Sequence, residues 1–267
     1  MGYEGPPRSQ STFICIREGG KEPAPAQRLD ARFLLAGTDV GNVRNFDAVL
    51  FDLDGTLCRR TQDTEAMYEL LFERAGEEPF GSPDELWAAL SGPPDHDDPV
   101  GYYGSGFARV AAQYGRTGVD ALALARELVA VIDDSQVTLL PGARDALDAA
   151  AAVGQIGVVT NGPADSQQTK LDALGLAERF DTVVFAAELP RAKPHALPFE
   201  RAMADLDVAP DRTLYVGNSL EYDVPGAQHA GLATAWLRTE ERAEPYEPEY
   251  TLDTLADLPR ILGGADD

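Results

Sequence analysis

Short runs of apolar residues alternate with stretches of helical spacing over most of this chain. The first apolar run spans Ala48 to Phe51, and the alternation becomes regular beyond Pro141. There, strands are expected at residues 156–159, 182–186, 213–216 and 233–237, and helices at 143–152, 165–174, 198–206 and 224–230. Short apolar strands that alternate with helices predict an α/β fold, in which a parallel sheet carries helices on both faces.

The segment between the first apolar run and the second expected strand has no strand-like pattern. Its helical patterns lie at residues 64–75, 83–90, 107–114 and 119–132. The stretches 91–99 and 101–106 are rich in glycine or proline and are expected to be loops. This segment therefore predicts a separate helical cap, inserted between the first strand and the rest of the sheet.

These patterns divide the chain into three parts. Residues 1–45 are rich in glycine, proline and charge, and we expect a loosely ordered extension. Residues 46–59 and 139–267 together form the expected core, and residues 60–138 form the expected cap. We find no apolar stretch long enough to cross a bilayer and no signal-peptide pattern at the N-terminus, so we expect a cytoplasmic protein.

The chain is strongly acidic, with 45 acidic and 22 basic side chains and a formal net charge of -23. This charge repels nucleic-acid phosphates and anionic membranes, so we expect neither as a partner. One hypothesis is adaptation to a high-salt cytoplasm, where screening removes the self-repulsion; the alternative is simply an acidic enzyme. Lysine is scarce, and its three positions are Lys21, Lys170 and Lys193. Two cysteines are too few for a disulfide framework or a metal cluster.

The first apolar run ends abruptly at two carboxylates, Asp52 and Asp54, which are followed by Gly55 and Thr56. Residues i and i+2 of a strand share a face, so these carboxylates can converge where the strand ends. Like charges so close are stable only if a cation lies between them or one of them holds a proton. The plainer alternative is a turn signal at Asp54-Gly55, with Asp52 as a cap.

Polar residues also follow later strands of the predicted sheet. Thr160, Asn161 and Gly162 follow one strand, Asn218 and Asp223 follow another, and Lys193 precedes Pro194 between them. Singly, these residues could be a turn, a helix cap and a solvated charge. Ligands of parallel sheets bind beyond the carboxyl ends of the strands, so the occurrence of all these signals in order favours one shared site.

The motifs Asp52–Thr56, Thr160-Asn161, Lys193-Pro194 and Gly217-Asn218-Ser219 with Asp223 resemble the four motifs of haloacid dehalogenase-like hydrolases. The resemblance covers residues 45–262. It implies a Rossmann-like, three-layer core with an α-helical cap inserted directly after the first motif. It also implies a phosphatase that acts on a small phosphorylated metabolite.

The resemblance further implies roles for the motif residues. Asp52 would be the nucleophile that forms an aspartyl-phosphate, and Asp54 would be the general acid and base. The phosphate oxygens would be held by Thr160, the Asn161 backbone and Lys193. The cofactor would be Mg²⁺, with Asp52, Asp54, Asn218 and Asp223 as its ligands.

One position departs from the pattern of the family, which usually has an acidic residue where this chain has Asn218. A neutral amide oxygen predicts weaker Mg²⁺ binding, with Asp223 or Glu221 completing the site. Because a halide leaves without a proton, Asp54 favours a phosphatase over a dehalogenase. Two alternatives stay open, a sugar-phosphate mutase and a catalytically weak binding module, and the sequence leaves the oligomeric state open as well.

Overall fold

The computed structural model of the protein describes residues 45–90, 96–239, 243 and 245–263. The extension expected at residues 1–45 lies outside the described residues, except for its last residue, and so does part of the loop expected at 91–99. Over the described residues the structure confirms the α/β fold with a helical insertion.

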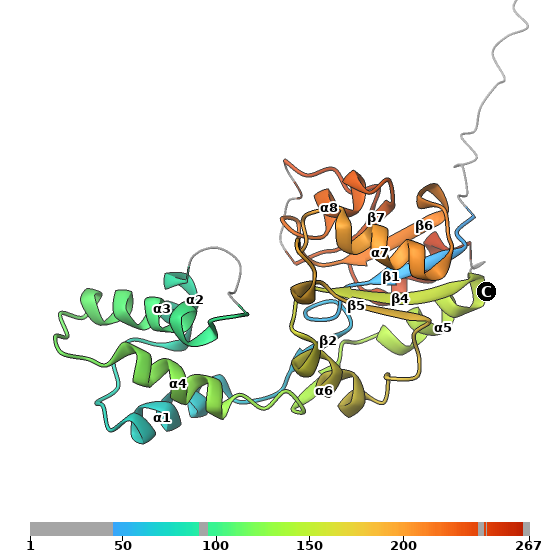
Figure 1. Ribbon diagram of the computed structural model, residues 1–267. Helices are drawn as coiled ribbons and strands as arrows, with labels where there is room; N and C mark the ends of the chain where they lie inside the picture. The colour runs from blue at the N-terminus through green and yellow to red at the C-terminus, as the bar shows by residue number, and fades with distance from the viewer. Residues whose placement is uncertain (1–44, 91–95, 240–242, 244, 264–267) are drawn as a thin grey trace, which may run out of the picture. The chain divides into compact units, whose positions relative to one another are not determined.

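The core is a parallel sheet of six strands in the order β5-β4-β1-β6-β7-β8 (Figure 1). The strands are β1 (Ala48–Phe51), β4 (Gln155–Thr160), β5 (Thr182–Phe185), β6 (Thr213–Gly217), β7 (Ala233–Leu237) and β8 (Tyr250–Leu252). The first five lie where the sequence predicts strands. Edge strand β8 was not predicted, because three residues with a single buried side chain are too short to show a period.

Helices cover both faces of the sheet, as predicted. The core helices are α5 (Ala143–Val153), α6 (Ala164–Leu174), α7 (Leu197–Leu206), α8 (Val224–His229) and α9 (Leu258–Ile261). Three 3-10 turns accompany them: Ala186–Glu188, Pro210–Arg212 and Leu255–Asp257. Among the described residues, none of the helices combines the length and the apolar character that a membrane span requires.

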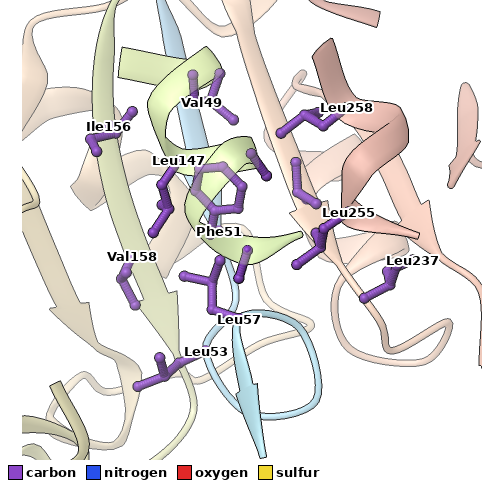
Figure 2. Close-up of a cluster of buried hydrophobic side chains, with 14 of the residues drawn as sticks. Val49, Phe51, Leu53, Leu57, Leu147, Ile156, Val158, Leu237, Leu255 and Leu258 are labelled. Carbon is purple, nitrogen blue, oxygen red and sulfur yellow. The ribbon is translucent and has the colours of Figure 1, made fainter. Parts of the chain in front are cut away.

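The residues of β1 alternate between the two faces of the sheet, because successive side chains of a strand point in opposite directions. Val49 and Phe51 belong to a hydrophobic cluster with Leu147 of α5, and Figure 2 shows these three side chains together. Ala48 and Leu50 belong to a second cluster, formed with α7 and α8. Strand β1 is therefore buried on both sides, and its carboxyl end is fixed in place by the packing of two layers.

The strands β4 and β6 flank β1, with Phe51 in register with Val158 on one side and Val216 on the other. All three strands run in the same direction, so their carboxyl ends meet at one edge of the sheet. The residues that follow β1, β4 and β6 in the sequence therefore lie close together in space.

The helical cap has its own hydrophobic cluster, which includes Tyr68, Phe72, Phe107 and Leu124. Its helices are α1 (Thr64–Ala75), α2 (Pro83–Ala89), α3 (Pro99–Gln113) and α4 (Ala121–Val131). Each helix begins after a side chain that accepts a hydrogen bond from the first turn: Asp63, Ser82, Asp98 and Asp120. The exact bounds of the cap as a domain stay a prediction.

The prediction of a loop at residues 101–106 is wrong, because these residues lie in the first half of α3. Asp98 caps the helix by accepting a hydrogen bond from the Gly101 N–H at 2.8 Å, and Pro99 occupies the first turn. A Cβ on Gly104 would lie 2.7 Å from Leu122 Cδ2, and one on Gly106 would lie 2.8 Å from Leu90 Cδ2. These glycines therefore allow close packing of the helix against its neighbours.

The prediction that the insertion contains only helix and loop is also incomplete. Strands β2 (Cys58–Arg60) and β3 (Val137–Leu139) form an antiparallel two-stranded ribbon, with Cys58 opposite Leu139. The chain enters the cap through β2 and leaves it through β3. Strands of three residues show no period in the sequence, so only their pairing defines them.

Candidate active site

Asp52 lies directly after β1, at the edge where the strand ends meet. Its N–H donates to the Val216 carbonyl of β6 at 2.9 Å, and the residue is only 7% exposed. The Lys193 ammonium donates to Asp52 Oδ1 and to Asp223 Oδ1, at 2.7 Å in each case. A buried ammonium group therefore joins two buried carboxylates. Asp52 follows β1 and Asp223 follows β6, so the two carboxylates are 171 positions apart in the sequence.

This cluster has two carboxylates but only one ammonium group, so a negative charge remains in a buried place. Burial, the largest cause, and the charge of Asp223 together raise the pKa of Asp52 to about 7, against the attraction of Lys193. Burial alone would lower the pKa of Lys193, but the charges of Asp223 and Asp52 outweigh burial and raise it. A second cation beside Asp52 would neutralise the remaining charge.

Two side chains hold Lys193 in place. The Tyr215 hydroxyl accepts a hydrogen bond from the Lys193 ammonium at 3.0 Å and lies 3.0 Å from Asp223 Oδ1. The Asn161 amide donates to the Lys193 carbonyl at 3.0 Å, and its oxygen accepts from the Lys193 N–H at 2.9 Å. The Asn161 side chain thus binds the backbone on both sides of the lysine, and the phosphate contact predicted for its backbone stays a prediction.

Asp54 lies in a different environment, with its side chain 44% exposed. The Lys170 ammonium donates to both of its oxygens, at 2.8 and 2.7 Å, and the Gln167 amide donates to Oδ2 at 2.9 Å. Both donors come from α6 and are buried. Gly162 makes room for Gln167, because a Cβ there would lie 1.7 Å from Gln167 Nε2.

Asn218 lies beside the first motif. Thr56 donates to Asn218 Oδ1 at 3.0 Å, and a Cβ on Gly55 would lie 2.7 Å from Asn218 Nδ2. Asp223 Oδ1 accepts a hydrogen bond from Lys193, and Oδ2 accepts one from the Ser219 N–H at 2.8 Å, so its role as a metal ligand stays a prediction. Glu221 is exposed. Within the described part of the chain, no group of three or more His, Cys, Asp or Glu side chains could hold a metal ion.

A cleft of about 490 Å³ opens at this edge of the sheet. It is lined by the predicted site residues Asp52, Asp54, Thr160, Asn161, Lys193, Asn218 and Asp223, and also by Gln167 and Lys170. Thr160 is buried, and its hydroxyl accepts a hydrogen bond from the Gly162 N–H at 3.3 Å. Arg60, Tyr102 and Tyr103 of the cap line the same cleft. The volume suits a small-molecule ligand.

Sequence reasoning missed Lys170, Gln167 and Tyr215. The scarcity of lysine was a signal for Lys170, and its spacing from Gln167 places both on one face of a helix. Tyr215 was hidden because it lies inside an apolar strand. A tyrosine in that setting needs a partner for its hydroxyl, which was the available signal.

A parallel sheet with a helical cap, and with carboxylates, a lysine and an amide gathered beyond its strand ends, defines an α/β protein of the Rossmann-like class. The chain belongs to the haloacid dehalogenase-like hydrolase family, whose sequence model matches residues 46–231.

The chain is similar to two curated proteins with names that indicate phosphate chemistry. It is 38% identical over 129 residues to pyrimidine 5'-nucleotidase YjjG of Escherichia coli K12, a match that covers 47% of this chain and 57% of YjjG. It is 36% identical over 112 residues to pyrophosphatase PpaX of Bacillus mycoides KBAB4, covering 40% and 52%. These matches span about half the length of the curated relatives.

Among solved structures, magnesium-bound YfnB from Bacillus subtilis is similar with a TM-score of 0.63 and 25% identity. This match covers 82% of the chain and 99% of YfnB. The likeness thus extends over the core and the cap together, whereas the sequence matches to YjjG and PpaX are shorter.

Proposed function

We propose that this protein is a Mg²⁺-dependent phosphatase that hydrolyses a small phosphorylated metabolite through an aspartyl-phosphate intermediate. The observation that carries the proposal is the placement of Lys193 Nζ 2.7 Å from both Asp52 and Asp223, in a cleft that Asp54 also lines. The names of the relatives YjjG and PpaX, a nucleotidase and a pyrophosphatase, support phosphate chemistry.

In the first step, a carboxylate oxygen of Asp52 attacks phosphorus, and the bond from phosphorus to the leaving oxygen breaks. Asp54 gives its proton to that oxygen. In the second step, a water molecule attacks phosphorus, the bond to Asp52 breaks, and Asp54 takes the proton of the water. Asp52 Oδ1 is bonded to Lys193, whereas among the described residues Oδ2 has only a long contact of 3.5 Å with Thr56. Oδ2 is therefore the oxygen that is free to react.

Lys193 neutralises charge on both carboxylates and lies where it can also meet an oxygen of the phosphoryl group. Thr160 and Asn161 line the same cleft. In the proposed mechanism the Thr160 hydroxyl and the Asn161 backbone complete the phosphate site. Because Asn161 binds the backbone of Lys193 on both sides, the ammonium group keeps its place while charge moves between substrate and Asp52.

The residues present fit a magnesium ion. Magnesium binds oxygen ligands and uses one or two carboxylates together with substrate phosphate and water. Asp52, Asp54 and Asn218 offer such oxygens, the buried cluster has an uncompensated negative charge, and Asp223 contributes only through Oδ2. When bound, the ion reduces the repulsion between the nucleophile and the phosphate dianion.

The proposal is tested with 4-nitrophenyl phosphate and Mg²⁺, in low and in molar salt. We expect turnover by the native protein, a loss of at least about a hundredfold in Asp52→Asn, and no loss in Asp211→Asn, which removes an exposed carboxylate. Mass spectrometry of the acid-quenched enzyme should find phosphate on the peptide that contains Asp52. Full activity in Asp52→Asn would disprove the mechanism.

The same experiment separates the two alternatives. Conversion of a hexose 1-phosphate to the 6-phosphate, in place of phosphate release, would identify a mutase. No turnover of any phosphate ester by the native protein would indicate a binding module.

A further inference from the structure

We propose that Lys170 and Gln167 are positioning residues, which hold the carboxyl group of Asp54 where it can exchange a proton with the substrate. This inference rests on the proposed phosphatase function. It assigns a task to two buried polar side chains outside the four sequence motifs.

The burial of Lys170 is the first observation. Its side chain is 3% exposed, and within the described part of the chain the structure gives its ammonium group one partner, Asp54. Burying a lysine is unfavourable unless its charge is paired. The two bonds of 2.8 and 2.7 Å grip both oxygens of the carboxyl group, which fixes its plane as well as its position.

Gln167 supplies the second observation. It lies one helical turn before Lys170, so both side chains leave the same face of α6. Its amide donates to Asp54 Oδ2 at 2.9 Å, although its own Oε1 is buried and has no hydrogen-bond partner among the described residues. A buried amide that leaves one atom unsatisfied is unfavourable for stability, so the bond to Asp54 accounts for its presence better than packing does.

The chain also makes space for this contact. Gly162 follows β4, and any larger residue there would collide with the Gln167 amide. Three sites on two elements are thus adapted to the contact with Asp54, namely Gly162 after the strand and Gln167 and Lys170 on α6.

The backbone of Asp54 forms an isolated β-bridge with Cys58 in the turn after β1, whereas its side chain is 44% exposed and is bound by the donors of α6. Its remaining exposed side faces the cleft. A proton passes between Asp54 and an oxygen of the substrate only within hydrogen-bond distance, and a misplacement of about 1 Å slows such steps by about 10²-fold. The two donors of α6, which line the same cleft, provide this placement.

The test compares two substrates of similar shape, 4-nitrophenyl phosphate and benzyl phosphate. Nitrophenolate leaves without a proton, whereas the benzyl alkoxide needs one. The ratio kcat/KM reports the steps up to the first phosphoryl transfer. In Lys170→Met and in Gln167→Leu we expect kcat/KM to fall by about tenfold or more for benzyl phosphate, and by less than about threefold for 4-nitrophenyl phosphate.

The matched control is Gln168→Leu, since Gln168 is the exposed neighbour of Gln167 and binds Asp172. Gln168→Leu should leave kcat/KM unchanged for both substrates. Lys170→Arg should restore part of the benzyl phosphate activity. In an Asp54→Asn background, adding Lys170→Met should change kcat/KM by less than about twofold, because the lysine acts only through the carboxyl group.

The inference would be overturned if Lys170→Met and Gln167→Leu lowered kcat/KM equally for both substrates. It would also be overturned if Lys170→Met lowered kcat/KM as much in the Asp54→Asn background as in the native protein. Neither result would contradict the proposed phosphatase function. A native protein that hydrolyses neither substrate would overturn the proposed function and the inference together. Thermal unfolding of each variant, measured in parallel, identifies a loss that comes from misfolding.

Discussion

Two lysine–carboxylate groups lie at the same edge of the sheet and differ in burial. Lys193 and its partners Asp52 and Asp223 have side chains that are 3%, 9% and 2% exposed. Lys170 is equally buried at 3%, but its partner Asp54 is 44% exposed. In the first group, hereafter the buried cluster, all charges are surrounded by protein. In the second group, the half-open pair, the carboxyl group has one side toward solvent.

Both groups are held by hydrogen bonds, and the difference between them is the access of solvent to the carboxyl group. The buried cluster is tied by Tyr215 and Asn161 as well as by its own ion pairs, so its geometry is set before a ligand arrives. In the half-open pair, the Asp54 carboxylate is held by the donors of α6 and is still accessible from the cleft. A nucleophile requires the first kind of environment, and a proton carrier that must meet different oxygens in two steps requires the second.

The comparison is tested most strongly by removing each lysine charge in turn. Lys193→Met leaves two buried carboxylates without a cation, and we expect the free energy of unfolding to fall by about 3–5 kcal/mol. In Lys170→Met the half-exposed Asp54 can be hydrated, so we expect a loss of about 1 kcal/mol or less. Denaturant unfolding of both variants in the same salt measures the difference. Equal losses would contradict the comparison.

Cys58 pairs with Asp54 in an isolated β-bridge and tests the electrostatics around the half-open pair. Burial, the largest cause, and the charge of Asp54 raise the pKa of its thiol to about 12, whereas the charge of Lys170 acts to lower it. The reactive thiolate increases with pH, so at about pH 8 we expect alkylation by iodoacetamide to be ~10³-fold slower than in unfolded protein. The experiment uses Cys15→Ser, which leaves Cys58 as the single thiol.

Adding Lys170→Met to that background should slow alkylation of Cys58 further, because a charge that lowers the thiol pKa is removed. A native rate close to the unfolded rate, or faster alkylation without Lys170, would show that this side of the cleft is organised differently.

Tyr215 tests how far the buried cluster depends on its neutral partner. Tyr215→Phe removes the hydroxyl that contacts Lys193 and Asp223 and retains the ring that packs on Phe199. We expect a loss of about 2 kcal/mol in the free energy of unfolding, typical of a hydrogen bond to charged groups. Tyr246→Phe, outside this cluster, serves as the matched control. An unchanged free energy of unfolding in Tyr215→Phe would mean that the ion pairs alone fix Lys193.

The smallest expected effect is at Asn218, where a substitution should strengthen the binding of Mg²⁺. Asn218→Asp adds an anionic oxygen beside Asp52, and we expect Mg²⁺ affinity to rise by about tenfold. The increase in the thermal unfolding midpoint with Mg²⁺ concentration measures this affinity, with Asn45→Asp as the control at an exposed asparagine. An unchanged affinity would exclude Asn218 as a metal ligand.

The buried parallel strands could be predicted from the sequence, because a strand covered on both faces is a short continuous apolar run. The positions of Asp52 and Asp223 at one edge followed from strand direction, whereas Lys193 was assigned to that edge because the polar signals occur in order along the chain. Their proximity is confirmed, whereas their catalytic roles stay predictions.

The parts that failed depend on contacts between elements. Residues 101–106 have the composition of a loop but form a helix. This helix packs so closely against Leu122 and Leu90 that only glycine fits at positions 104 and 106. The contact of Lys170 with Asp54 depends on how α6 docks beside β1. Spacing within one helix carries no information on that docking.

The paired strands β2 and β3 have a consequence for how this protein could be rebuilt. Cys58 and Leu139 face each other in the ribbon, so the two ends of the helical segment leave the sheet domain about 5 Å apart. A gap of that width is the one a tight hairpin turn closes. The segment can therefore be exchanged as a cassette, with a short turn or a foreign cap grafted between the same two strands, while the layered core keeps its path.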